Sequence, residues 1–245
     1  PCTAEVTGAG GLKQALTVTY DKNTDAGTAT ATASYAGDSN HLGGDGSATF
    51  TIDKAPSQVT VTCNPSSVTF TGSPIEPCTA RAKGVGGLDT SAPVSYAHNV
   101  EVGTATATGT YTGDANHLAS TGSGTFTIGS WTPSGFYQPV DMGTTLNTVK
   151  NGSTVPLKFE VFRDGVELTS TSIVTSFTAT MIACQTSAPV DDIEFTTTGG
   201  TSLRYDTTAG QFVQNWQTPK KPGTCYLVTM TTQDKSTVKA QFKLK

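Results

Sequence analysis

Five cysteines have the most easily assigned chemistry in this sequence: Cys2, Cys63, Cys78, Cys184 and Cys225. They lie in strand-like contexts without a Cys-x-x-Cys pair, which favours disulfides in an oxidising compartment over metal or redox chemistry. Cys63 and Cys78 flank a short loop and a strand, so their bond would join two neighbouring strands. Cys184 and Cys225 are the two cysteines of the C-terminal part and are expected to pair. Cys2 is then left without a partner.

Two histidines follow the same Gly-Asp-x-Asn sequence, His41 after Asp38 and His117 after Asp114. One interpretation is a calcium or other metal loop, since Asp38, Asn40 and Asp45 resemble alternating ligands. The other is that the aspartates accept hydrogen bonds from backbone N–H groups of the loop. The second copy has threonine in place of Asp45, although a real calcium site would have been duplicated. We therefore predict structural aspartates and no metal site.

No catalytic motif is visible. His98 stands alone, and a nucleophile elbow, a phosphate loop and a His-Glu-x-x-His motif are all missing. The acids Asp191, Asp192 and Glu194 could suggest glycosidase carboxylates, but adjacent acids on a strand or loop usually face solvent. We assign no catalytic, cofactor-binding or metal-binding residue and expect a protein that is not an enzyme.

Aromatic residues gather near the middle of the chain, at Trp131, Phe136 and Tyr137. Aromatic rings of this kind can bind sugar rings, which makes these residues a candidate ligand surface for a glycan or a protein. They could instead seal an interface between two domains, and this second interpretation is favoured.

Composition excludes several classes of partner. The net charge is −4 and the Lys and Arg residues are scattered, so the basic footprint of a nucleic-acid-binding protein is missing. The sequence contains no run of about 18 apolar residues, so we expect no insertion into a membrane. Together with the expected disulfides, this composition favours a secreted or cell-surface protein.

An internal duplication dominates the first half of the chain. Residues 1–52 align with residues 77–128 without a gap, at a constant offset of 76, and 29 of the 52 positions are identical. Residues 35–42 recur as residues 111–118, and a Thr-Phe-Thr-Ile segment follows each block. Such repetition suits a spacer better than an active site.

Short β-branched runs bounded by Gly, Pro, Asn and Asp predict an all-β chain. In residues 104–108 threonine alternates with alanine, so each type lies on one face, with alanine inward or the reverse. In the complete repeat the expected strands are 58–63, 68–70, 78–82, 94–96, 103–111 and 124–128.

The Tyr-x-Gly-Asp-x-Asn stretch, the Thr-Phe-Thr-Ile strand that follows it and the cysteine pair of the opening strands resemble the bacterial Ig-like repeats, group 3 type. Such repeats are common in secreted adhesins and surface proteins. The resemblance covers residues 1–129 and implies tandem β-sandwiches with a spacer or adhesive role. It divides the region into a repeat at 1–53 that lacks its first strands and a complete repeat at 54–129.

The pattern changes at Trp131, where residues 131–135 are predicted to be a linker. Residues 130–245 are expected to form a separate β-domain, with Asp164-Gly165 as a hairpin turn. Its expected strands are 155–162, 166–168, 176–182, 202–205, 212–216, 225–231 and 238–244. Its expected core residues are Phe159, Phe177, Phe195, Phe212, Trp216 and Phe242.

Three segments of this domain carry a second resemblance: residues 135–141, residues 147–159, which include Pro156-Leu157-Lys158-Phe159, and residues 223–226. They are similar to the Pro-x-Lys-Phe (PxKF) domain found at the C-termini of secreted bacterial proteins. This resemblance implies a C-terminal β-sandwich and no catalytic residues.

The first repeat starts at the counterpart of Pro77, so its opening strands, and the cysteine that would pair with Cys2, are not in the sequence. Either the protein continues upstream, or a strand from a neighbouring molecule completes this sandwich, because open sheet edges accept strands. For the second case we predict an assembly interface with an upstream segment or with the C-terminal strand. Its residues would be Cys2, Thr3, Ala4, Val238 and Phe242.

These observations predict an extracellular structural protein, a stalk or fibre segment that associates with itself or with neighbouring Ig-like domains. An adhesin or accessory module that binds glycan or protein is the alternative.

Overall fold

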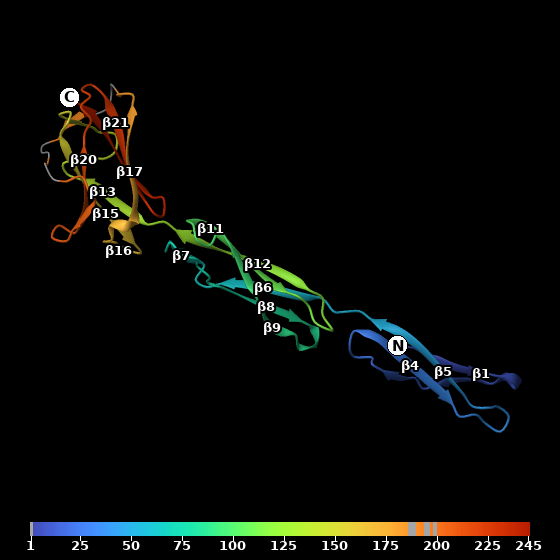
Figure 1. Ribbon diagram of the computed structural model, residues 1–245. Coiled ribbons are helices and arrows are strands. Elements are labelled where there is room, and N and C mark those ends of the chain that lie inside the picture. The colour runs from blue at the N-terminus through green and yellow to red at the C-terminus, as the bar shows by residue number, and fades with distance from the viewer. Residues whose placement is uncertain (1, 186–189, 194–196, 198–199) are drawn as a thin grey trace. The chain divides into compact units, whose positions relative to one another are not determined.

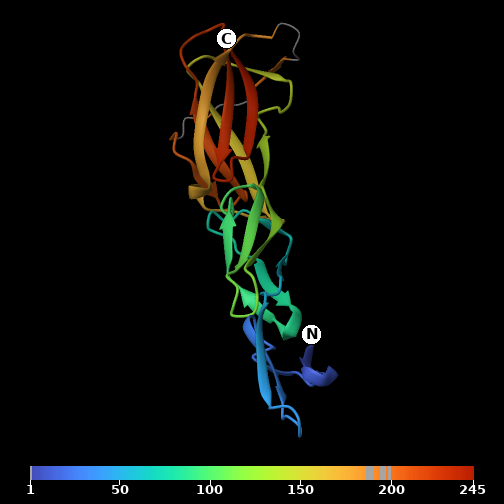
Figure 2. The ribbon, with the colours of Figure 1, turned by 90° about the vertical axis from the view of Figure 1, so that its right-hand side faces the viewer.

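The computed structural model describes residues 2–185, 190–193, 197 and 200–245, with the backbone alone at residues 190 and 192 (Figures 1 and 2). Glu194 and Phe195 lie outside the described residues. The chain clusters into two compact units, each built from three stretches. Unit 1 comprises Pro1–Asn64, Pro77–Ala97 and Thr106–Thr125, and unit 2 comprises Pro65–Glu76, His98–Ala105 and Phe126–Lys245. The predicted boundaries after residues 53 and 129 remain predictions.

The protein is all-β, as the sequence pattern predicts, and its sheets are consistent with a β-sandwich fold. Figure 1 shows arrows from one end of the chain to the other. The helical turns among the described residues are three short 3-10 segments: Ala9–Gly11, Val85–Gly87 and Thr171–Ile173.

The alternation of threonine and alanine explains the central strands, β4 (Gly27–Tyr35) and β11 (Gly103–Tyr111). Successive side chains of a strand point to opposite faces, so one face can be made of small residues alone. The alanines are the inward residues, since Ala29, Ala105 and Ala107 are fully buried. The sequence left the direction open, and the structure settles it in favour of alanine inside.

Three sheets lie entirely within unit 1. β1 (Ala4–Thr7) pairs with β2 (Lys13–Leu16), and β3 (Thr19–Asp21) lies beside β4, which pairs with β5 (Gly44–Ile52). The third sheet has the order β6-β8-β9, with β6 at Ser57–Cys63, β8 at Cys78–Gly84 and β9 at Asp89–Ala92. β10 (Val94–Ala97) pairs with β11 in a further, four-stranded sheet that continues through two strands, β12 and β7, given below.

Unit 2 begins with β7 (Ser67–Thr69), which runs parallel to the end of β12 (Ser120–Gly129). Two five-stranded sheets follow. The first joins β13 (Thr132–Tyr137), β15 (Thr154–Arg163), β20 (Gln211–Gln217), β19 (Arg204–Asp206) and β16 (Val166–Glu167). The second has the order β17 (Val174–Ile182), β21 (Cys225–Thr232), β22 (Thr237–Leu244), β14 (Leu146–Val149) and β18 (Val190–Asp192).

Aromatic residues form much of the core of these two sheets. Phe159 and Phe212 stack with their ring centroids 5.1 Å apart, and Trp216 meets Phe242 edge to face at 4.9 Å. Three of the expected core residues are fully buried, whereas Phe177 and Trp216 are half-buried. The predicted hairpin is confirmed: Asp164 and Gly165 both have positive φ and connect β15 to β16, as a two-residue turn requires.

Two expectations are wrong. Residues 132–135 belong to β13 and pair with β15, so this segment is a strand and not a linker. The C-terminal strand is not free for donation, because β22 is hydrogen-bonded to β21 on one edge and to β14 on the other. Val238 and Phe242 are therefore buried core residues of this strand, and we withdraw them from the assembly interface.

Candidate functional site

The second repeat shows what the opening strand does. β6 pairs with β8 in an antiparallel register from Ser57 opposite Gly84 to Cys63 opposite Cys78. On its inner face Val59 is buried in one cluster with alanines of β8 and β9, and Val61 packs against the same cluster. The strand therefore supplies two valines to the core and one cysteine at its end.

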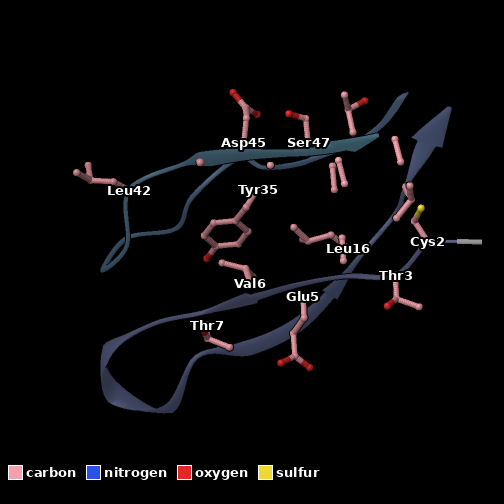
Figure 3. A pocket seen from close by; sticks show the side chains of 18 residues that line it. Cys2, Thr3, Glu5, Val6, Thr7, Leu16, Tyr35, Leu42, Asp45 and Ser47 are labelled. Carbon is pink, nitrogen blue, oxygen red and sulfur yellow. The ribbon is translucent and has the colours of Figure 1, made fainter. Parts of the chain in front are cut away.

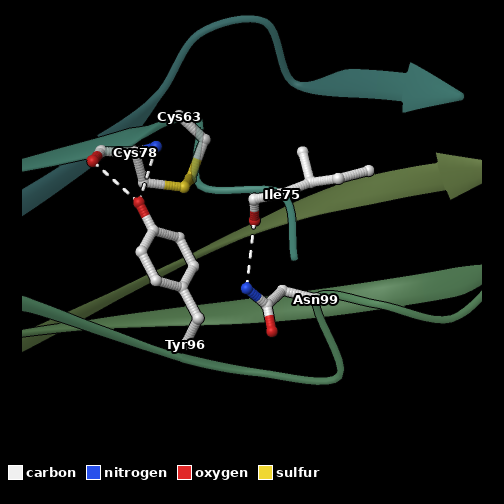
Figure 4. Close-up of a disulfide and its surroundings, with 5 residues drawn as sticks. All are labelled: Cys63, Ile75, Cys78, Tyr96 and Asn99. Carbon is white, nitrogen blue, oxygen red and sulfur yellow. Dashed lines mark hydrogen bonds between the residues drawn. A yellow bond between two sulfur atoms is a disulfide. The ribbon is translucent and has the colours of Figure 1, made fainter. Parts of the chain in front are cut away.

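The disulfide between Cys63 and Cys78 closes this strand pair (Figure 4). Tyr96 holds the backbone of Cys78, because its hydroxyl accepts from the Cys78 N–H at 3.0 Å and donates to the Cys78 carbonyl at 2.9 Å. The bond predicted from the spacing is formed. The second predicted bond, between Cys184 and Cys225, is also formed.

The first repeat keeps the same frame around Cys2. The Tyr20 hydroxyl accepts from the Cys2 N–H at 2.7 Å and donates to the Cys2 carbonyl at 3.3 Å, as Tyr96 does for Cys78. The Cys2 thiol is free and half-buried. Within the described residues, β1, the counterpart of β8, pairs only with β2. The strand edge that β6 occupies in the second repeat is therefore open in the first.

A groove of about 580 Å³ lies beside this open edge. Its lining comes from β1, β2, β4 and β5 and includes Cys2, Val6, Leu16, Tyr35 and Ala48. Figure 3 shows Val6, Leu16 and Tyr35 between the two layers of ribbon, while Glu5 points away from them. The groove has an apolar floor because alternate residues of each strand face it.

Two glycines of β12 lie so close to β6, the opening strand of the second repeat, that a side chain would not fit between them. A Cβ placed on Gly122 would lie 2.2 Å from the Val59 carbonyl oxygen of β6, and one on Gly124 would lie 3.1 Å from the Val61 side chain. The counterpart of Gly122 is Gly46, where an added Cβ would meet nothing within 4 Å. Gly46 therefore keeps the space for a strand backbone that, among the described residues, is present only in the second repeat.

The histidine loops are built by hydrogen bonds. Asp114 Oδ1 accepts from the backbone N–H groups of Asn116 at 2.8 Å and His117 at 2.7 Å, and Tyr111 donates to Asp114 Oδ2 at 2.8 Å. His117 Nδ1 lies 2.9 Å from Asp114 Oδ1, and its Nε2 lies 2.9 Å from the Val85 carbonyl. The loop at Asp38 and His41 repeats this pattern.

This geometry agrees with the prediction that Asp38 and Asp114 accept backbone hydrogen bonds. The hydrogen bonds from the Asn40 backbone, Tyr35 and His41 hold the pKa of Asp38 down, at about 2. A carbonyl acceptor and then the neighbouring aspartate raise the pKa of both histidines. In the part of the chain that is described, no group of three or more His, Cys, Asp or Glu residues could hold a metal ion.

The aromatic residues do not form an exposed ligand surface. Trp131 is 5% exposed, and its ring contacts Phe70 edge to face at 5.4 Å while Nε1 donates to the Phe70 carbonyl at 3.0 Å. Phe136 is buried against Phe159. Tyr137 is half-buried and donates to Glu160 at 2.6 Å. The three side chains thus belong to the packing of unit 2, because their polar atoms are already satisfied within the fold.

Two further results concern the chain as a whole. Among the residues described, no helix has the length and apolar character needed to cross a bilayer. The chain matches no known protein-family model and no curated protein.

Proposed function

We propose that this protein is an extracellular structural protein, a stalk or fibre segment of a bacterial surface protein without enzymatic activity. The observation that carries the proposal is the set of hydrogen bonds in unit 1 around Asn116, which lies in the histidine loop of the second repeat. Its side chain accepts from the Ala26 N–H at 2.8 Å and donates to Asp25 at 2.8 Å. Both partners belong to the first repeat, so polar contacts link one repeat to the next.

The segment between the repeats supports the same proposal. The Ala55 N–H donates to the Asn116 carbonyl and the Leu118 N–H donates to the Ala55 carbonyl, both at 2.8 Å. A backbone that pairs with the next loop loses conformational freedom, unlike a flexible linker. A restrained connection between repeats suits a stalk or fibre segment, in which each repeat holds the next one in place.

The Trp131 region of unit 2 gives similar support. The Trp131 N–H donates to Asp234, and Ser236 donates to the Trp131 carbonyl at 3.3 Å. Trp131 also contacts Phe70 of the second repeat. One buried side chain thus links residues 70, 131 and 234, which are far apart in sequence.

The family and location form part of the proposal. The repeat motifs support membership of the bacterial Ig-like repeats, and residues 135–141, 147–159 and 223–226 support a PxKF domain. Two disulfides favour an oxidising compartment, such as the cell surface or the extracellular medium.

A replacement experiment tests the spacer role. Residues 1–129 are exchanged for two unrelated disulfide-containing β-sandwiches of similar length, and an epitope tag is placed at the N-terminus. A spacer tolerates the exchange, so antibody should reach the tag on intact cells as it does in the wild type. Binding of the wild type, but not the exchanged protein, to a glycan array would support the adhesin alternative instead.

A further inference from the structure

The groove of the first repeat has the features of a binding site for one particular kind of strand. The second repeat contains the same site in its occupied form, with Val59, Val61 and Cys63 of β6 as occupants. The two repeats share an alignment without gaps, so each position that faces β6 can be matched to one in the first repeat. The match is not identical: Gly109 and Gly124, which lie close to Val59 and Val61, correspond to Ala33 and Ala48.

The register can be transferred residue by residue. Cys63, Val61 and Val59 lie opposite Cys78, Ala80 and Ala82. With the offset of 76, the corresponding positions are Cys2, Ala4 and Val6, and all three line the groove. A strand bound in this register places one cysteine against Cys2 and two valines over the apolar floor.

The burial of the facing residues supports the use of the β6–β8 register for a strand bound to β1. Ala80 and Ala82 are buried beneath β6, whereas their counterparts Ala4 and Val6 are only half-buried. Burying apolar surface is favourable, and an extended strand would also pair with the edge of β1 that faces no strand among the described residues.

We propose that the first repeat binds an extended segment with the pattern Val-x-Val-x-Cys, antiparallel to β1, and forms a disulfide between that cysteine and Cys2. The β6 strand of an intact second copy is not the occupant, because it is already paired with β8 and bonded to Cys78. The partner is a segment of this chemistry outside residues 57–63. The inference rests on the proposed function for its biological setting, but its test is binding in vitro and is independent of display on cells.

The covalent step is a thiol–disulfide exchange. The Cys2 thiolate attacks the cysteine sulfur of a mixed disulfide carried by the incoming strand. The old S–S bond breaks, and its electron pair leaves with the departing thiolate, which takes up a proton. The mixed disulfide is therefore the oxidant, and one S–S bond replaces another.

The peptide Ser-Gln-Val-Thr-Val-Thr-Cys, the sequence of β6 itself, is the probe, with its cysteine activated as a mixed disulfide with an aromatic thiol. Mixed with the full chain, it should form a one-to-one adduct at Cys2, located by peptide mapping. It should react at least about tenfold faster than a peptide with asparagine at both valine positions, since 1.4 kcal/mol of binding energy corresponds to a factor of ten. Equal rates would mean that Cys2 is only an accessible thiol, and would overturn the inference.

Two variants locate the strand. Gly46→Val should leave the melting temperature of the free protein unchanged, because a Cβ at this position meets nothing within 4 Å, yet it should abolish the rate advantage. Thr49→Val on the same strand, whose side chain does not line the groove, is the matched control and should react like the wild type. If Gly46→Val reacts normally, the strand does not occupy the groove.

The Cys2→Ser variant distinguishes non-covalent pairing of the strand from formation of the disulfide. With excess peptide it should form no adduct, but amide protons along Thr3–Thr7 should gain protection from hydrogen exchange. A lack of protection would contradict the proposed β-pairing. If the wild-type protein instead forms dimers that exclude the peptide, a second copy is the occupant and the proposal is wrong.

Discussion

His117 Nδ1 and Asp114 Oδ1 lie 2.9 Å apart, and the opposite ring nitrogen of His117 faces a carbonyl oxygen. Both partners of the ring are acceptors, so the doubly protonated imidazolium satisfies both at once. The loop is thereby a charged hydrogen-bonding unit that joins the strand end at Tyr111 to the 3-10 turn at Val85. The first repeat has the same unit.

The stability of unit 1 should depend on pH in two directions. A raised histidine pKa gives stability that is complete below about 6.5, the unfolded value, and is lost as pH rises through the folded pKa. A lowered aspartate pKa gives stability that is complete above about 3.9 and is lost as pH falls towards the folded pKa. Calorimetry should therefore find the highest melting temperature between about pH 4 and 6.5. His98→Asn, at an exposed position of positive φ, should leave this profile unchanged; a flat profile in the wild type would contradict the role of the loops.

Asp114→Ala should lower the melting temperature of unit 1 by several degrees, because two backbone N–H groups and Tyr111 lose their acceptor. The loss should be the same in calcium and in chelator. Asp45→Ala, an exposed residue of β5, is the control and should have little effect. A rise in melting temperature with calcium that disappears in Asp114→Ala would show that the loop binds the ion.

Each disulfide should contribute measurably to stability. For closed loops with sequence separations of 15 and 41 residues, chain entropy predicts about 3 kcal/mol for Cys63–Cys78 and about 4 kcal/mol for Cys184–Cys225. Denaturant unfolding of the paired serine variants measures both values. Peptide mapping under non-reducing conditions should recover these two bonds, and a bond between Cys78 and Cys184 would refute the structure.

Trp131→Ala should destabilise unit 2 by about 3–5 kcal/mol, the usual cost of removing a large buried aromatic residue. Trp131→Phe should cost less, since the ring contact with Phe70 remains while the Nε1 hydrogen bond is lost. Thermal unfolding followed by the fluorescence of Trp216 measures both variants. If Trp131→Ala keeps its stability but loses affinity for a glycan, the result would support the hypothesis that Trp131, Phe136 and Tyr137 form a ligand surface.

Local sequence was sufficient for most strands and for the Cys63–Cys78 bond, because both depend on nearby residues. The Cys184–Cys225 bond joins residues 41 positions apart and followed from these being the two cysteines of the C-terminal part. Threonine and alanine alternate with the period of a strand, and Cys63 lies directly opposite Cys78 in the hairpin-like pair of β6 and β8. The hydrogen bonds of Asp114 were also predictable, since its backbone partners are two and three residues away.

Contacts between distant residues were not predictable in this way. His117 resembles a metal ligand until its second partner, the carbonyl of Val85, is known, and that residue is 32 positions away. Trp131 stands in a linker-like sequence, but its partners Phe70 and Asp234 are 61 and 103 positions away. The alternating pattern of β22 predicted a strand, but not that the strand is central in its sheet.

The two disulfides also limit how far the chain can lengthen under tension. An extended chain reaches about 3.5 Å per residue, so the loop closed between Cys63 and Cys78 withholds about 50 Å of contour length, and the loop between Cys184 and Cys225 withholds about 140 Å. When the protein unfolds under tension, it therefore releases less contour length with its disulfides intact than with its cysteines reduced. For the proposed surface stalk, oxidation of these four cysteines would shorten the fully extended chain by about 190 Å.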